Sequence, residues 1–106
     1  MRIEFVAVGS ELLNGDLADT HTARLGRRLR SVGLGLHRSQ TVPDDLSEIV
    51  TALRDAATRA DLVLVSGGLG STDDDMTMAA ASAMTGQALV QDVPTLERIR
   101  GRYEAL

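Results

Sequence analysis

The sequence predicts an α/β fold: a three-layer sandwich in which a mostly parallel sheet lies between helices. Short apolar runs that end at glycines have the pattern of buried strands. Stretches with apolar residues at helical spacing lie between these runs. Strands that alternate with helices imply right-handed crossovers and a parallel sheet covered on both faces.

The first part of the chain predicts a strand and a helix. Ile3–Val8 is a continuous apolar run that ends at Gly9, so we expect it in the centre of the sheet. A helix is predicted over Thr20–Val32, because its apolar residues recur at helical spacing and it stops at Gly33, which suits a left-handed helix cap. Arginines occupy its outer face.

The middle of the chain predicts another strand and another helix. Leu34–Val42 alternates loosely and is closed by Pro43, which indicates a strand nearer the edge of the sheet. Asp45 and Glu48 have the spacing of a capping box. The apolar stripe that follows predicts a helix to about Ala60.

The last part predicts two strands and two helices. The apolar run Leu62–Val65 predicts a second central strand. The alanine-rich stretch Thr77–Thr85, ended by a glycine, predicts a helix that lies close to the sheet. A brief strand is expected at Ala88–Gln91. Pro94 then suits the first position of a final helix over Thr95–Leu106.

Length and composition predict one domain over residues 1–106. No stretch approaches the roughly 20 apolar residues that span a bilayer. The first strand begins directly after Met1, and the chain has no cysteine. We therefore expect a cytoplasmic protein without disulfides or thiolate metal sites.

Charge and aromatic content narrow the classes of ligand. The net charge of -4 repels the phosphate backbone of nucleic acids. Phe5 and Tyr103 are the only aromatic residues, too few for a platform that stacks bases. Arginines cluster at 24–30 and 98–102, which indicates solvated helix faces or subunit contacts. We expect a small-molecule ligand held by backbone and polar groups, and no nucleic-acid or membrane partner.

The most informative stretch is the Gly-rich loop Ser66 to Asp75, between a predicted strand and a predicted helix. Glycines let a backbone turn sharply and approach a ligand, and free amides at a helix start attract a phosphate. Open α/β sheets bind ligands at the carboxyl ends of their strands. The loop predicts a site for a phosphate-bearing small molecule; the alternative is a turn without a ligand. The candidate binding residues are Gly67, Gly68, Gly70, Ser71 and Thr72.

Three consecutive aspartates, 73–75, oppose a bound phosphate unless a divalent cation lies between them. Asp44 follows another strand at the same predicted edge, so we expect it to face Asp75 across a cleft, with Mg²⁺ as the expected cation. The alternative is that Asp73 and Asp74 only favour a helix start, where negative charge is stabilising. Asp45 is assigned to the cap alone.

The loop after the first strand adds Gly9, Ser10 and Glu11 as candidate ligand-binding residues at this edge. The two histidines show no metal-ligand spacing, and no serine has an obvious histidine base. Nucleophilic triad chemistry is therefore not expected.

Three motifs carry a resemblance to a known family: V-G-S-E-L-L-N-G at 8–15, T-V-P-D-D at 41–45, and S-G-G-L-G-S-T-D-D-D-M-T at 66–77. The sequence resembles the molybdopterin-binding (MoaB/Mog-like) domains of molybdenum cofactor biosynthesis, most closely the N-terminal domain of CinA (competence/damage-inducible) proteins. The resemblance covers nearly the whole chain, and the third motif is specific. Ser71 and His21 depart from the family pattern, which has proline and asparagine there.

The resemblance implies a domain that binds molybdopterin or a nucleotide and, in CinA-like proteins, a metal-dependent hydrolase acting on the pyrophosphate of ADP-ribose. It places Asp44 and Asp75 on the family's paired functional aspartates, as catalytic and metal-binding residues, and the glycines of the Gly-rich loop on its phosphate loop. The family's domain normally continues further. We therefore expect a domain that is incomplete at its C-terminal end.

Three functions remain open at this point. The first is a CinA-like nucleotide-binding or molybdopterin-binding domain with ADP-ribose pyrophosphatase activity. The second is molybdenum cofactor biosynthesis, by molybdopterin adenylylation or molybdate insertion. The third is a non-catalytic, truncated binding or assembly module whose exposed apolar sheet edge drives self-association. The expected partners are ADP-ribose, AMP or molybdopterin, and a second copy of the chain in a homo-oligomer.

Overall fold

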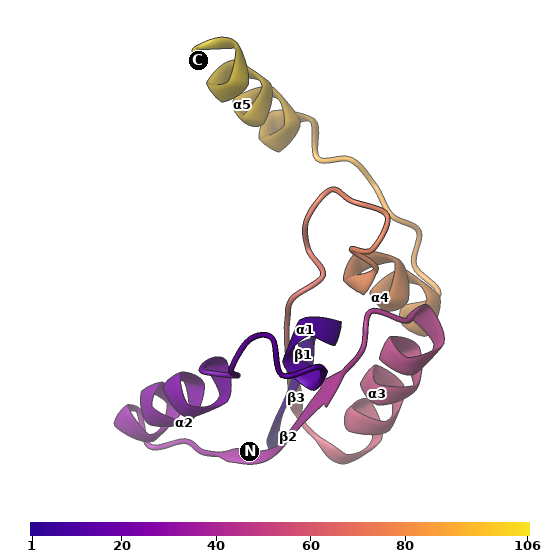
Figure 1. The fold of residues 1–106 in the computed structure, drawn as a ribbon. Helices are drawn as coiled ribbons and strands as arrows, with labels where there is room; N and C mark the ends of the chain where they lie inside the picture. The colour runs from indigo at the N-terminus through magenta and orange to yellow at the C-terminus, as the bar shows by residue number, and fades with distance from the viewer.

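The computed structural model describes all 106 residues and has three strands and five helices (Figure 1). In chain order these are β1 (Ile3–Val8), α1 (Ser10–Leu13), α2 (His21–Ser31), β2 (Leu36–Val42), α3 (Leu46–Arg59), β3 (Leu62–Ser66), α4 (Thr77–Thr85) and α5 (Val93–Glu104).

The sheet is parallel and has the strand order β2-β1-β3. All six residues of β1 are buried, so β1 is the central strand as its apolar run predicts. The register sets Val6 opposite Gln40 of β2 and Val65 of β3. The prediction that β3 is also central is wrong, because no strand pairs with its outer side; β3 is an edge strand, as β2 is predicted to be.

Helices lie on both faces of this sheet (Figure 1), so the three-layer α/β prediction is confirmed. On one face, α3 and α4 close a core that contains Val6, Val8, Ile49, Leu53 and Ala80. On the opposite face lies α2, which has no buried residue. The core therefore sits on the α3 side, and the α2 side is covered loosely.

Glu4 is a charged residue in the buried strand β1, with a side chain only 1% exposed. Its carboxylate accepts hydrogen bonds from Arg59 of α3, from Nη2 at 2.8 Å and from Nε at 3.0 Å. These bonds, with the positive charge of Arg59, hold the pKa of Glu4 below its usual value. The pair ties the end of α3 to the central strand.

Most predicted elements agree with the structure to within two residues, and α3 is capped by Asp45, which accepts from the amide of Glu48 at 3.0 Å. Two further predictions are wrong. The segment Ala88–Gln91 is exposed and forms no strand, because no strand lies beside it to form backbone hydrogen bonds with it. The stretch after Gly9 was expected as a loop and instead begins with the short helix α1.

The last helix, α5, stands away from the sheet and its covering helices (Figure 1). None of its residues is buried, and Ile99 and Tyr103 of its predicted apolar stripe are 48% and 74% exposed. Asp92 caps the helix by accepting from the amide of Thr95.

No helix in the structure combines the length and the apolar character that a membrane crossing requires.

Candidate functional site

The loop that follows β3 depends on glycine at its first two positions. Gly67 and Gly68 have φ angles of 90° and 64°, in the left-handed region that other residues rarely adopt. A Cβ on Gly67 would overlap the carbonyl oxygen of Val8, and one on Gly68 would overlap the hydroxyl of Thr77. The loop backbone therefore passes directly against the end of β1.

Thr77, at the start of α4, fastens the two ends of the loop to each other. Its hydroxyl donates to the carbonyl oxygen of Gly67 at 2.7 Å, and its amide donates to that of Gly68 at 3.2 Å. The residue is only 4% exposed. These bonds fix the path of the glycines relative to the helix.

Asp75 closes the outer half of the loop. Its Oδ2 accepts from the hydroxyl of Thr72 at 2.7 Å and from the amide of Thr72 at 3.1 Å. These bonds, together with one from the amide of Gly70, lower the pKa of Asp75 below its usual value. A Cβ on Gly70 would lie 2.6 Å from that oxygen, so glycine allows the close approach.

Several amides of this loop have no partner within the chain. Gly68, Leu69 and Ser71 donate no hydrogen bond from their backbone N–H groups. Leu69 and Ser71 are exposed, and so are Asp73 and Asp74. Unpaired amides in a glycine-rich turn are the groups that bind phosphates in other proteins.

The loops after β1 and β2 are also joined. The amide of Ser10 donates to Oδ2 of Asp44 at 3.1 Å, and the amide of Asp44 donates to the hydroxyl of Ser10 at 3.0 Å. The amide of Gly9 donates to the carbonyl oxygen of Val42 at 2.9 Å. Asp44 and Ser10, both predicted site residues, are therefore neighbours.

A cavity of about 270 Å³ opens at the carboxyl end of the sheet, beside these loops. Of the predicted site residues, Glu11 and Gly67 line it, and the Glu11 carboxylate lies against the backbone of Gly9. The complete lining is Ala7, Val8, Glu11, Leu12, Leu17, Ala18, Thr20, His21, Ser66 and Gly67.

The two aspartates predicted to share a cation belong to different loops. Asp44 is bonded to the loop after β1, and Asp75 is bonded within the loop after β3. No group of three or more histidine and carboxylate side chains in the chain is close enough to hold a metal ion. A cation at this edge would need further oxygen ligands from water or from a bound molecule.

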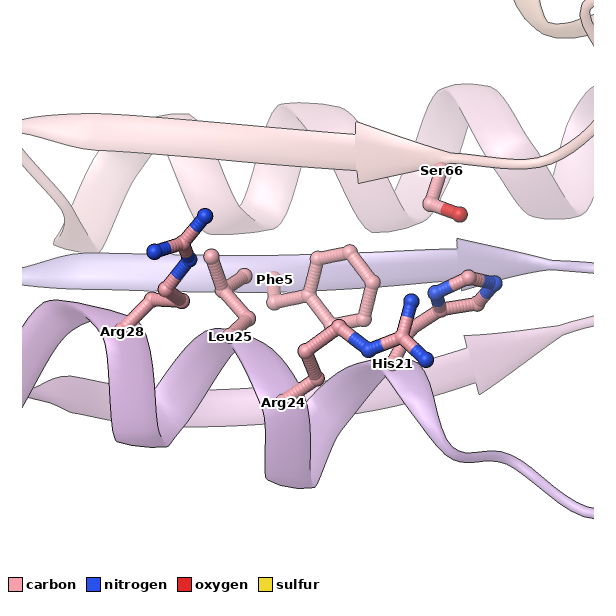
Figure 2. A pocket seen from close by; sticks show the side chains of 6 residues that line it. All are labelled: Phe5, His21, Arg24, Leu25, Arg28 and Ser66. Atoms are coloured by element: carbon pink, nitrogen blue, oxygen red, sulfur yellow. The ribbon is translucent and has the colours of Figure 1, made fainter.

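A second cavity, of about 230 Å³, lies between α2 and the sheet (Figure 2). It is lined by Phe5, His21, Arg24, Leu25, Arg28 and Ser66. From the sequence, the arginines of α2 are predicted to lie on a solvated helix face or at a subunit contact, and this cavity is not predicted. The available signal was the spacing of His21, Arg24 and Arg28, which places them on one side of a helix.

A family model described as a probable molybdopterin binding domain matches residues 4–105. A CinA-like protein of Geobacter sulfurreducens is 46% identical over 94% of this chain, and one of Deinococcus radiodurans is 43% identical over 96%. The chain spans about a quarter of the length of these relatives, 24% and 25%.

Solved structures show the same fold. The protein CinA from Thermoplasma acidophilum, described as of unknown function, superimposes with a TM-score of 0.91 at 39% identity, over 97% of this chain and 61% of its own. The molybdopterin biosynthesis enzyme MoaB from Thermus thermophilus superimposes with a TM-score of 0.68 at 28% identity, over 77% of this chain and 53% of its own.

Proposed function

The chain belongs to the family of probable molybdopterin binding domains and is CinA-like, and from this premise we propose that it binds a phosphate-bearing small molecule, a nucleotide or molybdopterin, at the Gly-rich loop Ser66 to Asp75. The observation that carries the proposal is the row of unpaired amides at Gly68, Leu69 and Ser71. The left-handed glycines bring this backbone to the carboxyl edge of the sheet, where open α/β sheets take their ligands.

The loop is held in shape before any ligand arrives. Thr77 fixes the first glycines, and Thr72 and Asp75 hold the outer turn. A ligand that meets a preformed set of donors loses less free energy to ordering than one that must organise a mobile loop. This arrangement supports phosphate binding by backbone amides, with the cavity beside Gly67 for the rest of the ligand.

We further propose that the ligand is ADP-ribose and that the domain hydrolyses its pyrophosphate, giving AMP and ribose 5-phosphate with consumption of one water. Asp44 and Asp75 would hold Mg²⁺, since Mg²⁺ is commonly bound by one or two carboxylates together with substrate phosphates. The bound cation would neutralise charge on the phosphates. The lowered pKa of Asp75 keeps its carboxylate ionised at neutral pH, as a cation ligand must be.

The test compares two neighbouring aspartates in the same loop. Asp75→Asn removes a carboxylate that the loop orients, whereas Asp74→Asn removes one that is exposed and has no hydrogen-bond partner in the chain. With ADP-ribose and Mg²⁺, the proposal expects AMP release by the wild type and by Asp74→Asn, and at least a hundredfold slower release by Asp75→Asn. Equal rates in both variants would exclude the assigned role of Asp75.

A second candidate is molybdenum cofactor biosynthesis, by adenylylation of molybdopterin or insertion of molybdate. The likeness to the molybdopterin biosynthesis enzyme MoaB favours it, since that structure superimposes on 77% of this chain. Saturable binding of molybdopterin without any binding of ADP-ribose would favour this candidate over the first.

A third candidate is an assembly module that forms a homo-oligomer. The exposed apolar residues of α5, including Val93, Ile99 and Tyr103, favour it, because exposed apolar surface promotes association. Sedimentation equilibrium distinguishes the cases: a monomer at all concentrations would contradict self-association.

A further inference from the structure

The cavity between α2 and the sheet combines positive charge with an apolar floor. Arg24, Arg28 and His21 extend from α2, and Phe5 of the central strand lies beneath them (Figure 2). Phe5 is only 3% exposed, whereas both arginines are exposed at the mouth. No carboxylate lines this cavity.

The two arginines have no counter-charge within the chain. The only salt bridge joins Arg59 to Glu4, and neither the side chain of Arg24 nor that of Arg28 donates a hydrogen bond to another residue. The nearest acidic residue along the chain, Asp19, is already occupied by the amides of His21 and Thr22 and by the hydroxyl of Thr22. In a chain with net charge -4, two unpaired guanidinium groups that share a cavity are therefore available to an external anion.

The spacing of these residues suits a single anionic group. Positions four apart on a helix have Cβ atoms about 5–6 Å apart. In Figure 2 the Arg24 guanidinium lies beside His21 and that of Arg28 lies beyond Leu25, so the exposed Arg28 side chain has to rotate for both to contact one oxyanion. Guanidinium groups match the geometry of phosphate oxygens and bind them bidentately. Two positive charges, with the imidazole of His21 beside them, match the two negative charges of a phosphate monoester better than the single charge of a carboxylate.

We propose that Arg24, Arg28 and His21 form a phosphate-binding pocket, distinct from the Gly-rich loop, that accepts the phosphate group of a small molecule between α2 and the sheet. This pocket stands without the proposed function, because inorganic phosphate alone is expected to occupy it. The apolar floor formed by Phe5 and Leu25 excludes water from one side of the anion and strengthens its interaction with the arginines.

The position of the pocket also bears on the ligand of the Gly-rich loop. Its lining and that of the loop cavity share His21 and Ser66, so the two cavities meet at the carboxyl end of β3. Their volumes of about 230 and 270 Å³, taken together, come within the range of about 300–1,000 Å³ of small-molecule sites. One ligand with two separated phosphates can reach both cavities; this extension rests on the proposed function.

The test is an NMR titration of ¹⁵N-labelled protein with sodium phosphate, without Mg²⁺ and at constant ionic strength. The signals to follow are the Nε–Hε groups of Arg24 and Arg28 and the backbone amides of Phe5 and Leu25. We expect saturable shifts with phosphate and none with acetate at the same concentration. Signals of the Gly-rich loop report on the proposed function separately, so either site can fail without the other.

Two double variants of equal charge complete the test. Arg24→Gln with Arg28→Gln removes the pocket cations, and Arg27→Gln with Arg30→Gln removes two exposed arginines of the same helix that line no cavity. The proposal expects phosphate affinity to fall about tenfold or more in the first double variant, and to remain within about twofold in the second. Absence of saturable shifts in the wild type, or equal loss in both double variants, would overturn it. The α2 residues are not buried, so both variants should keep the wild-type amide spectrum elsewhere.

Discussion

Ser10 and Asp44 exchange a pair of hydrogen bonds: the amide of each donates to the side chain of the other, at 3.1 and 3.0 Å. The two residues follow adjacent parallel strands and are 34 positions apart in the chain. The exchange fixes the loop after β1 against the loop after β2. It also determines where the Asp44 carboxylate lies at the candidate site.

Replacing Ser10 by alanine removes one of these bonds and leaves the amide of Asp44 without its acceptor. We expect Ser10→Ala to lower the free energy of unfolding by about 0.5–1.5 kcal/mol, the usual net contribution of such a bond. Ser71→Ala is the control, because Ser71 is exposed and its hydroxyl has no partner in the chain. Urea denaturation of both variants measures the difference; equal stabilities would contradict the assigned role of the exchange.

The Glu4–Arg59 pair should contribute to stability in a pH-dependent way. The pKa of Glu4 in the folded chain lies below 4.5, the ordinary value of a glutamate side chain, which an unfolded chain would show. The stabilisation is therefore fully present above about pH 4.5 and is lost as the pH falls through the lower, folded pKa. At pH 7 we expect Glu4→Gln to lower the free energy of unfolding by about 1.5–3 kcal/mol, and this difference to shrink on acidification.

Glu97→Gln is the control for this measurement, since Glu97 is exposed on α5 and forms no salt bridge. It should leave the unfolding free energy within about 0.5 kcal/mol of the wild type. Denaturation curves between neutral pH and the acid range test both statements. A Glu4→Gln effect that stays constant on acidification would show that the charge of Glu4 is not its source.

Alanine substitutions at two glycines with similar φ angles distinguish the cost of backbone strain from the cost of steric overlap. Gly86 has a φ of 73° and open space at its Cβ position, whereas Gly67 has a φ of 90° and faces the Val8 carbonyl. Gly86→Ala should cost about 1–2 kcal/mol for the left-handed conformation alone. Gly67→Ala should cost about 2–5 kcal/mol, because overlap adds to the same strain. If thermal or urea unfolding shows the same loss of unfolding free energy for both variants, the loop moves to relieve the overlap with Val8 at no additional cost.

Two isoleucines contrast the core with the last helix. Ile49 is fully buried between α3 and the sheet, whereas Ile99 on α5 is 48% exposed. Ile49→Ala should lower the free energy of unfolding by about 2–5 kcal/mol through the cavity it leaves. Ile99→Ala should change it by no more than about 0.5 kcal/mol. A large loss from Ile99→Ala, measured across a protein concentration series, would show that α5 is covered in solution.

The elements that were predicted correctly are specified by residues that lie close together in the sequence. Asp45 and Glu48 mark the start of α3 because the cap is a contact between residues three apart. The order of β1 and the helices follows from periodicity and glycine positions. The family and the fold class were also predicted correctly, because the motif at 66–77 is specific and lies at a strand-to-helix junction.

The errors arise where a residue's state depends on distant parts of the chain. Leu62–Ser66 would be a central strand only if another strand paired with its outer side. Ala88–Gln91 would likewise need a strand to pair with, and the sheet provides none for either segment. The cavity of Arg24 and Arg28 depends on how far α2 stands from Phe5. The spacing of these arginines in the sequence shows that they lie on the same side of a helix. It does not show which part of the protein that side faces.

In the function proposed for this chain, the Gly-rich loop Ser66 to Asp75 binds a nucleotide through its phosphates. It is tested most directly by isothermal titration calorimetry of the folded protein with AMP and with ADP-ribose, with and without Mg²⁺. We expect saturable heat that becomes larger or occurs at lower ligand concentration with Mg²⁺, that is lost in Asp75→Asn and that is retained in Asp74→Asn. No saturable heat from either nucleotide with a protein that unfolds cooperatively, or heat unchanged in Asp75→Asn, would contradict it.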